Sequence, residues 1–164
     1  MNICIIPGTF DPLTNGHMDI IKRAHKLFDK IYVTVFDNTS KKTLFTAAER
    51  LEILRRACAG MEKIVVDATS ELLADYAVSK NAGFIIRGVR NSVDYEYEYD
   101  LFRINKKIGN NVDTLLFPSN ADNSYISAAF VREMIKYNRD ISDFVPEEAR
   151  GLIIGYHKEK LFGT

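Results

Sequence analysis

Residues 7–17 combine turn glycines and polar side chains in a pattern that could bind phosphate groups. The segment reads PGTFDPLTNGH and follows an apolar run at 2–6, which we expect to form a buried strand that ends at Pro7-Gly8. An amphipathic stretch begins at His17, so this histidine is predicted to lie in the first turn of a helix. Unpaired N–H groups and the helix dipole favour an anion there. The segment points to nucleotide chemistry; the alternative is a pair of turn glycines beside a surface histidine.

Basic side chains that could hold phosphates come after later predicted strands. The dipeptide Lys41-Lys42 follows the second strand, and Arg87 and Arg90 follow the fourth. Lysine is a flexible point charge, whereas one arginine can bind two phosphate oxygens at once, so the set suits more than one phosphate group. The alternatives are a solvated loop for the lysines, and ion pairs of the arginines with Asp94 or Glu98.

The composition argues against several classes of protein. Lysine plus arginine equals aspartate plus glutamate at 22 each, so we expect no polycationic field for nucleic acid or a membrane surface. Two cysteines, Cys4 and Cys58, fit buried thiols in the reducing cytoplasm better than a disulfide framework. No apolar run is long enough for a bilayer span, and we expect no signal peptide. P-loop, dinucleotide-binding and zinc-finger spacings are missing from the sequence.

Strand-like and helix-like segments alternate along all 164 residues, which we expect to form one domain over 1–164. Strands are predicted at 2–6, 30–36, 63–66, 84–86 and 114–117. Helices are predicted from residue 17, from a capping box at 46–49 to near residue 60, and over 70–80, 93–108, 127–137 and 146–160. The alternation predicts an α/β fold, a Rossmann-like doubly wound five-stranded parallel sheet with helices on both faces. Ligands of such sheets bind beyond the carboxyl ends of the strands.

The predicted helix 93–108 is apolar on two faces. One face carries Tyr95, Tyr99 and Phe102, and the other carries Tyr97, Leu101, Ile104 and Ile108. One face would cover the core of its own chain and the other a neighbouring copy, so we expect an oligomer. The alternative is a helix wedged deep in a single core.

Four segments together resemble bacterial phosphopantetheine adenylyltransferases. They are PGTFDPLTNGH, the SKKTLFT loop, IIRGVR with DYEYEYDL behind it, and YIS before a helix, in matching order and spacing over nearly the whole length. TNGH alone is typical of a broad nucleotidyltransferase superfamily, whereas the combination indicates this family. The resemblance implies a cytoplasmic homohexamer that transfers an adenylyl group from ATP to 4′-phosphopantetheine, giving dephospho-coenzyme A and pyrophosphate. It also implies Mg²⁺ held mainly by ATP phosphates, with no protein ligand set of its own.

The resemblance further implies roles for individual residues. His17 and Thr9 would contact ATP phosphate and the transition state, with Lys41 and Arg90 completing the catalytic set. Phosphopantetheine would be held by Thr9, Lys41, Leu73 and Arg87. Besides Thr9 and His17, the ATP contacts would be Phe10, Gly88, Val89, Arg90, Glu98, Asn123, Ser124, Tyr125, Ile126, Ser127, Ala128 and Ala129.

Two other functions stay open. A sister nucleotidyltransferase would act on another phosphate, such as nicotinamide mononucleotide, or on a polyol phosphate with CTP. The set of Lys41, Leu73 and Arg87 argues against it. A non-catalytic regulator that binds a nucleotide or coenzyme A is the second alternative, prompted by two alanines near the expected triphosphate site, Ala128 and Ala129.

The family commonly has serines where this chain has Ala128 and Ala129, so two hydroxyls that could reach ATP phosphates are absent. Backbone N–H groups and the Ser127 cap remain, so we expect weakened or rearranged triphosphate contacts. Ala128→Ser combined with Ala129→Ser should lower the KM for ATP in steady-state kinetics. An unchanged KM would show that these hydroxyls are dispensable.

Overall fold

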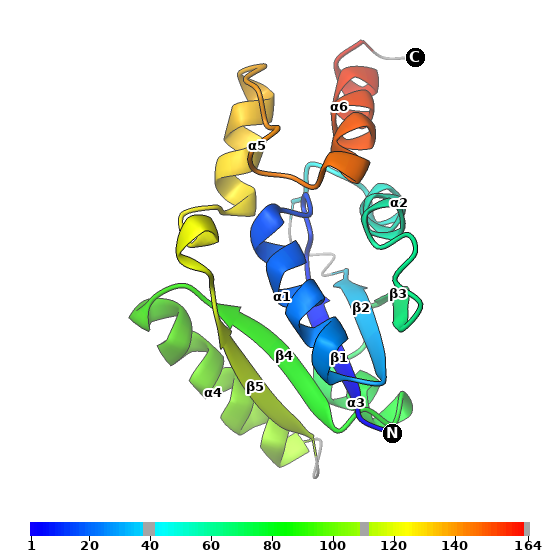
Figure 1. The fold of residues 1–164 in the computed structure, drawn as a ribbon, viewed down its shortest axis with the longest axis vertical. Helices are drawn as coiled ribbons and strands as arrows, with labels where there is room; N and C mark the ends of the chain where they lie inside the picture. The colour runs from blue at the N-terminus through cyan, green and yellow to red at the C-terminus, as the bar shows by residue number, and fades with distance from the viewer. Residues whose placement is uncertain (38–41, 109–111, 163–164) are drawn as a thin grey trace.

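The computed structural model describes residues 1–37, 42–108 and 112–162. Its single sheet has five parallel strands in the order β3-β2-β1-β4-β5. The strands are β1 (Ile3–Gly8), β2 (Lys30–Phe36), β3 (Ile64–Thr69), β4 (Phe84–Val89) and β5 (Asp113–Pro118). The chain builds outward from β1 to β3, then crosses back and builds in the other direction through β4 and β5 (Figure 1). This confirms the predicted Rossmann-like doubly wound sheet, whose switch point lies between β1 and β4.

The structure corrects where β1 ends. Pro7 and Gly8 do not stop the strand, because their positions pair with Thr34 and Val35 of β2. On the other side, the pairing of β1 with β4 covers only Cys4 and Ile5. Proline has no N–H to donate to a ladder, so one neighbour can be kept while the other diverges. Strands β1 and β4 therefore separate at their carboxyl ends.

The expected helices are present within the described residues, with shifted ends. They are α1 (Asn15–Leu27), α2 (Ala47–Ala57), α3 (Leu73–Ser79), α4 (Ser92–Ile108), α5 (Ala128–Lys136) and α6 (Glu147–Phe162), with a 3₁₀ turn η1 (Ala121–Asn123). Helices α1 and α2 pack on one face of the sheet, whereas α3 and α4 pack on the other (Figure 1). Helices α5 and α6 stand beyond the carboxyl edge of the sheet. No helix in the described ranges is long and apolar enough to cross a membrane.

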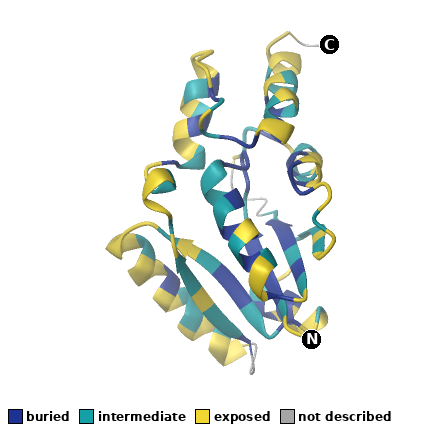
Figure 2. Ribbon diagram, viewed as in Figure 1, coloured by how far each residue is buried: buried dark blue, intermediate teal, exposed yellow. Residues whose placement is uncertain are grey.

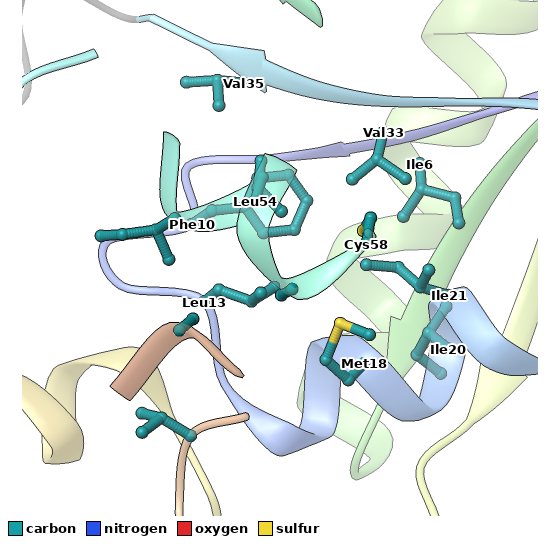
Figure 3. Packing of buried hydrophobic residues seen from close by; sticks show 14 of the residues in the cluster. Ile6, Phe10, Leu13, Met18, Ile20, Ile21, Val33, Val35, Leu54 and Cys58 are labelled. Carbon is teal, nitrogen blue, oxygen red and sulfur yellow. The ribbon is translucent and has the colours of Figure 1, made fainter. Parts of the chain in front are cut away.

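The main hydrophobic core extends into the loop that follows β1. Phe10 and Leu13 of this loop belong to the same buried cluster as Met18 of α1 and Leu54 of α2 (Figure 3). Both loop residues are at most 2% exposed. Burial of two large side chains leaves the loop backbone little freedom, so the phosphate-binding segment expected from the sequence is a fixed part of the fold.

Candidate active site

A cleft of about 960 Å³ opens at the carboxyl edge of the sheet, where β1 and β4 part. It is bordered by the loop after β1, the first turn of α1, the end of β4, the start of α3, one face of α4 and the start of α5. Of the residues proposed from the sequence, the cleft is lined by Thr9, Phe10, His17, Leu73, Arg87, Gly88, Arg90, Glu98, Asn123, Ile126, Ser127 and Ala128. The structure therefore brings most of the site residues predicted from the sequence together at one cavity.

Some predicted positions fall elsewhere. Val89, Ser124, Tyr125 and Ala129 do not line the cleft, and Tyr125 is 66% exposed. The segment from Arg87 to Val89 was expected in a loop after the fourth strand, but β4 continues to Val89, because it pairs with β5 along its whole length. Lys41 lies outside the described residues.

His17 occupies the third position of α1 and completes an unusual capping box. The Thr14 side chain accepts a hydrogen bond from the His17 backbone N–H, and the Thr14 backbone N–H donates to Nδ1 of His17 at 3.1 Å. Because Nδ1 is the acceptor, the proton of the neutral ring resides on Nε2. Burial lowers the pKa of His17 to about 4, with further lowering by the charges of Arg87 and Arg90. His17 thus offers the cleft a neutral Nε2–H donor.

Phe10 lies in the loop that precedes this helix and has an unusual backbone conformation. Its φ of +49° lies in the left-handed region, which a bulky side chain rarely adopts. Its ring packs edge-on against the ring of His17, with centroids 5.1 Å apart. On the other side, a Cβ added to Gly8 would come within 2.8 Å of the Phe10 ring. Glycine at position 8 therefore provides the space in which the ring is seated.

Arg87 and Arg90 are both ion-paired. Arg87 donates from Nε and Nη2 to the Glu98 carboxylate at 2.7 and 2.5 Å, and from Nη1 to the Pro7 carbonyl at 3.0 Å. Arg90 binds the Asp94 carboxylate at 2.8 and 3.2 Å. This hydrogen bonding raises the pKa of Arg90 and lowers the pKa of Asp94. The alternative of ion pairs, raised from the sequence, is confirmed.

Arg132 of α5 is a cleft residue that was not predicted from the sequence. This arginine lines the cleft and donates from Nη1 to the Asp11 carbonyl at 2.7 Å. Asp11 is buried, and its carboxylate accepts the backbone N–H groups of Leu44 and Phe45, both at 2.9 Å. An arginine on an amphipathic helix looks like a surface residue in sequence, so only the fold brings it to the cleft.

The acidic and thiol groups give no metal centre within residues 1–37, 42–108 and 112–162, since no three His, Cys, Asp or Glu side chains cluster suitably. Of the carboxylates that line the cleft, those of Asp11, Asp37, Asp94 and Glu98 each have an arginine within 4 Å, whereas the Glu71 side chain accepts a hydrogen bond from the Thr69 hydroxyl. Cys4 and Cys58 are free and buried, and burial raises their pKa values to about 12 and about 11. Neither thiol is poised as a nucleophile.

Comparison with known proteins identifies the family. Residues 5–134 match the cytidylyltransferase-like family. A phosphopantetheine adenylyltransferase from Nautilia profundicola is 46% identical over 144 residues, which cover 88% of this chain and 94% of that protein. The chain belongs to the cytidylyltransferase-like family, among the phosphopantetheine adenylyltransferases. It is therefore a nucleotidyltransferase. The cleft at the switch point of its sheet is the candidate active site.

Solved structures with low sequence identity share the fold. A candidate nicotinate-nucleotide adenylyltransferase from Vibrio parahaemolyticus has a TM-score of 0.72 at 16% identity, covering 96% of this chain and 97% of its own. A nicotinic acid mononucleotide adenylyltransferase from Plasmodium falciparum, complexed with APC, has a TM-score of 0.68 at 17% identity, covering 94% and 95%. At such identity the likeness concerns the fold alone.

The environment of His17 predicts its titration. We expect ¹⁵N NMR to show a neutral ring with the proton on Nε2 down to about pH 5, and protonation only near pH 4. The folded pKa lies below the ordinary value of 6.5, so the unfolded state binds more protons between these values. The stability that His17 contributes is therefore complete above pH 6.5 and decreases as the pH falls toward 4. In urea-unfolded protein the same ring should titrate near 6.5; a similar value in the folded protein would contradict this assignment.

Proposed function

We propose that this chain transfers the adenylyl group of ATP to the phosphate of 4′-phosphopantetheine, giving dephospho-coenzyme A and pyrophosphate. The observation that carries this proposal is the two-part character of one cleft. Its polar part gathers Thr9, His17 and the arginines, and its apolar part runs between α3 and α4. Leu73 faces this apolar part together with Leu101 and Ile104. A substrate with a phosphate at one end and a long, thin arm fits such a cavity.

The reaction needs no nucleophile or base from the protein. The acceptor phosphate is already anionic near neutral pH, and one of its oxygens attacks the α-phosphorus of ATP in line. The bond from the α-phosphorus to the oxygen that bridges to the β-phosphorus breaks, and pyrophosphate leaves with those electrons. Catalysis then consists of positioning two anions and stabilising the charge on the transferring group. No covalent enzyme intermediate forms.

His17 is the group we assign to the transferring phosphate. Its Nε2–H would donate to an oxygen on the α-phosphorus, and the ring needs no change of protonation because its low pKa keeps it neutral. Thr9 lies on the loop between β1 and α1 and would contact both the ATP phosphate and the acceptor phosphate. The N-terminus of α1 favours the same negative charge through its dipole.

Arg87 and Arg90 would bind phosphates while remaining paired with their carboxylates. Glu98 and the Pro7 carbonyl use only some of the N–H groups of Arg87, so Nη1 and Nη2 can still donate to the acceptor phosphate. The carboxylates hold both guanidinium groups in fixed orientations, which reduces reorganisation when substrate arrives. A direct ATP contact of Glu98, and binding of the acceptor by Lys41, stay predictions from the family resemblance.

Mg²⁺ would accompany ATP. Four of the five carboxylates that line the cleft in the described ranges already face arginines, so the donor set suits a cation whose ligands are mostly phosphate and water oxygens. When bound, the cation would neutralise part of the triphosphate charge and favour departure of pyrophosphate.

We also propose that the chain works as a homo-oligomer, a hexamer by family resemblance, in the cytoplasm. Among the side chains of α4 only Glu98 is buried, so the helix is not wedged into a single core (Figure 2). The stacked rings of Tyr95 and Tyr99 are 50% and 47% exposed on this helix. Such an apolar face suits a second copy, and sedimentation equilibrium measures the assembly. Two free buried cysteines agree with a reducing compartment.

The decisive experiment is pyrophosphate release by the purified chain with ATP and Mg²⁺. We expect release with 4′-phosphopantetheine, and none with nicotinamide mononucleotide or glycerol 3-phosphate, because only the first acceptor fills the channel between α3 and α4. Each acceptor is repeated with CTP in place of ATP. Release with another pair would assign the chain to a sister reaction. ATP binding without release for any acceptor would favour the regulator.

His17→Ala should lower kcat about 100-fold, while raising the KM for ATP far less, because the donor acts mainly on charge that develops in the transition state. Steady-state kinetics with both substrates measure the two constants. His25→Ala, on the same helix and away from the cleft lining, is the matched control. Equal effects of His17→Ala on kcat and KM would refute a transition-state role.

A further inference from the structure

We propose that Arg50 is a positioning residue of this active site, holding the backbone at Thr9 and Phe10 in the conformation that the phosphates require. The inference rests on the proposed function, since it names how the site of that reaction is kept in shape. Arg50 lies on α2, does not border the cleft, and is 1% exposed. It would act on substrate only through the residues that it holds.

The Arg50 guanidinium joins three segments of the chain. Nη1 donates to the Thr9 carbonyl at 2.9 Å, and Nε donates to the Phe45 carbonyl at 3.1 Å. Nη2 donates to Oδ1 of Asp37 at 2.6 Å. These acceptors belong to the loop after β1, the segment before α2 and the residue after β2. One buried side chain therefore ties together the pieces of backbone that form this corner of the carboxyl edge.

A buried charge is a costly way to stabilise a core. The positions around Arg50 in α2 include Ile53 and Leu54, both fully buried in the main hydrophobic cluster. Proteins in which apolar side chains replace a buried ion pair are often as stable as the original protein, or more stable. The one carboxylate that Arg50 binds, Asp37, keeps 42% of its side chain exposed. The presence of an arginine at position 50 is therefore better explained by the directions of its hydrogen bonds than by a contribution to the stability of the fold.

The backbone held by Arg50 is strained. Phe10, with φ +49°, immediately follows the carbonyl that Arg50 binds. A non-glycine residue keeps such a conformation only where the surroundings determine it, and such positions gather at functional sites. Arg50 fixes the chain before Phe10, and the buried Asp11 fixes it afterwards by accepting the N–H groups of Leu44 and Phe45. The strained residue is thus clamped from both sides.

The clamp determines where one backbone donor points. The carbonyl and the N–H of a trans peptide point in opposite directions, so a Thr9 carbonyl directed at Arg50 turns the Phe10 N–H away from Arg50. Thr9 and Phe10 both line the cleft. A lysine at position 50 would keep the charge, but a single ammonium cannot reproduce the planar arrangement of donors that spans three acceptors.

The test compares Arg50→Lys with Arg55→Lys, an exposed arginine on the same helix. Arg50→Lys should lower kcat at least tenfold, change the KM for ATP less than threefold, and melt within a few degrees of the unaltered enzyme. Arg55→Lys should match the unaltered enzyme throughout. A kcat of Arg50→Lys within twofold of the unaltered value overturns the proposal. A lower kcat that comes with an equally large rise in KM and a lower melting temperature also overturns it.

Two further measurements separate positioning from folding and from the proposed function. The Phe10 amide cross-peak in a ¹H–¹⁵N spectrum should move in Arg50→Lys, whereas amides of β5 stay in place. This readout needs no turnover: if the unaltered chain releases no pyrophosphate with any acceptor, the proposed function fails, and an unmoved Phe10 amide still overturns the role of Arg50. In Arg50→Ala, guanidinium ion at millimolar concentration should restore part of kcat, and equimolar methylammonium should not. Equal rescue by both ions also overturns the proposal.

Discussion

The parting of β1 and β4 beyond Ile5 is the constraint on which the site depends. Parallel strands that stayed paired to their ends would leave no room between them for a ligand. Pro7 has no N–H for a ladder on that side, and the Arg87 side chain instead donates to its carbonyl. The same arginine is held by Glu98, so its guanidinium is fixed at the point where the two strands separate.

A second constraint converts that opening into a shaped phosphate site. Phe10 and Leu13 are buried in the core, so the loop after β1 cannot collapse into the cleft or swing away from it. The loop ends at Thr14, whose backbone N–H sets the tautomer of His17. Packing of the loop, its backbone conformation and the hydrogen bond from Thr14 together orient one donor, the Nε2–H of His17. This order explains why the functional residues lie so close together in the chain.

Local patterns predicted the elements well and their ends less well. The second strand and the capping box at Thr46 are as predicted, because both depend on neighbours in sequence. The predicted ends of β1 and β4 were wrong, because the partner strand decides how far each strand extends. Arg50 and Arg132 carry no local signal, since an arginine on an amphipathic helix is usually exposed. Tertiary contacts alone distinguish them.

The pairing of the arginines changes how the cleft selects its ligands. A cluster of unpaired cations would attract any polyanion, and its attraction would be screened strongly by salt. Arg87 and Arg90 are instead neutralised by Glu98 and Asp94, and His17 is uncharged at neutral pH because its pKa is lowered to about 4. At these three residues, recognition relies on N–H groups in fixed directions, which favour a phosphate in one orientation. Such a site gives up general affinity for anions and gains the geometric control that an in-line transfer between two phosphates requires.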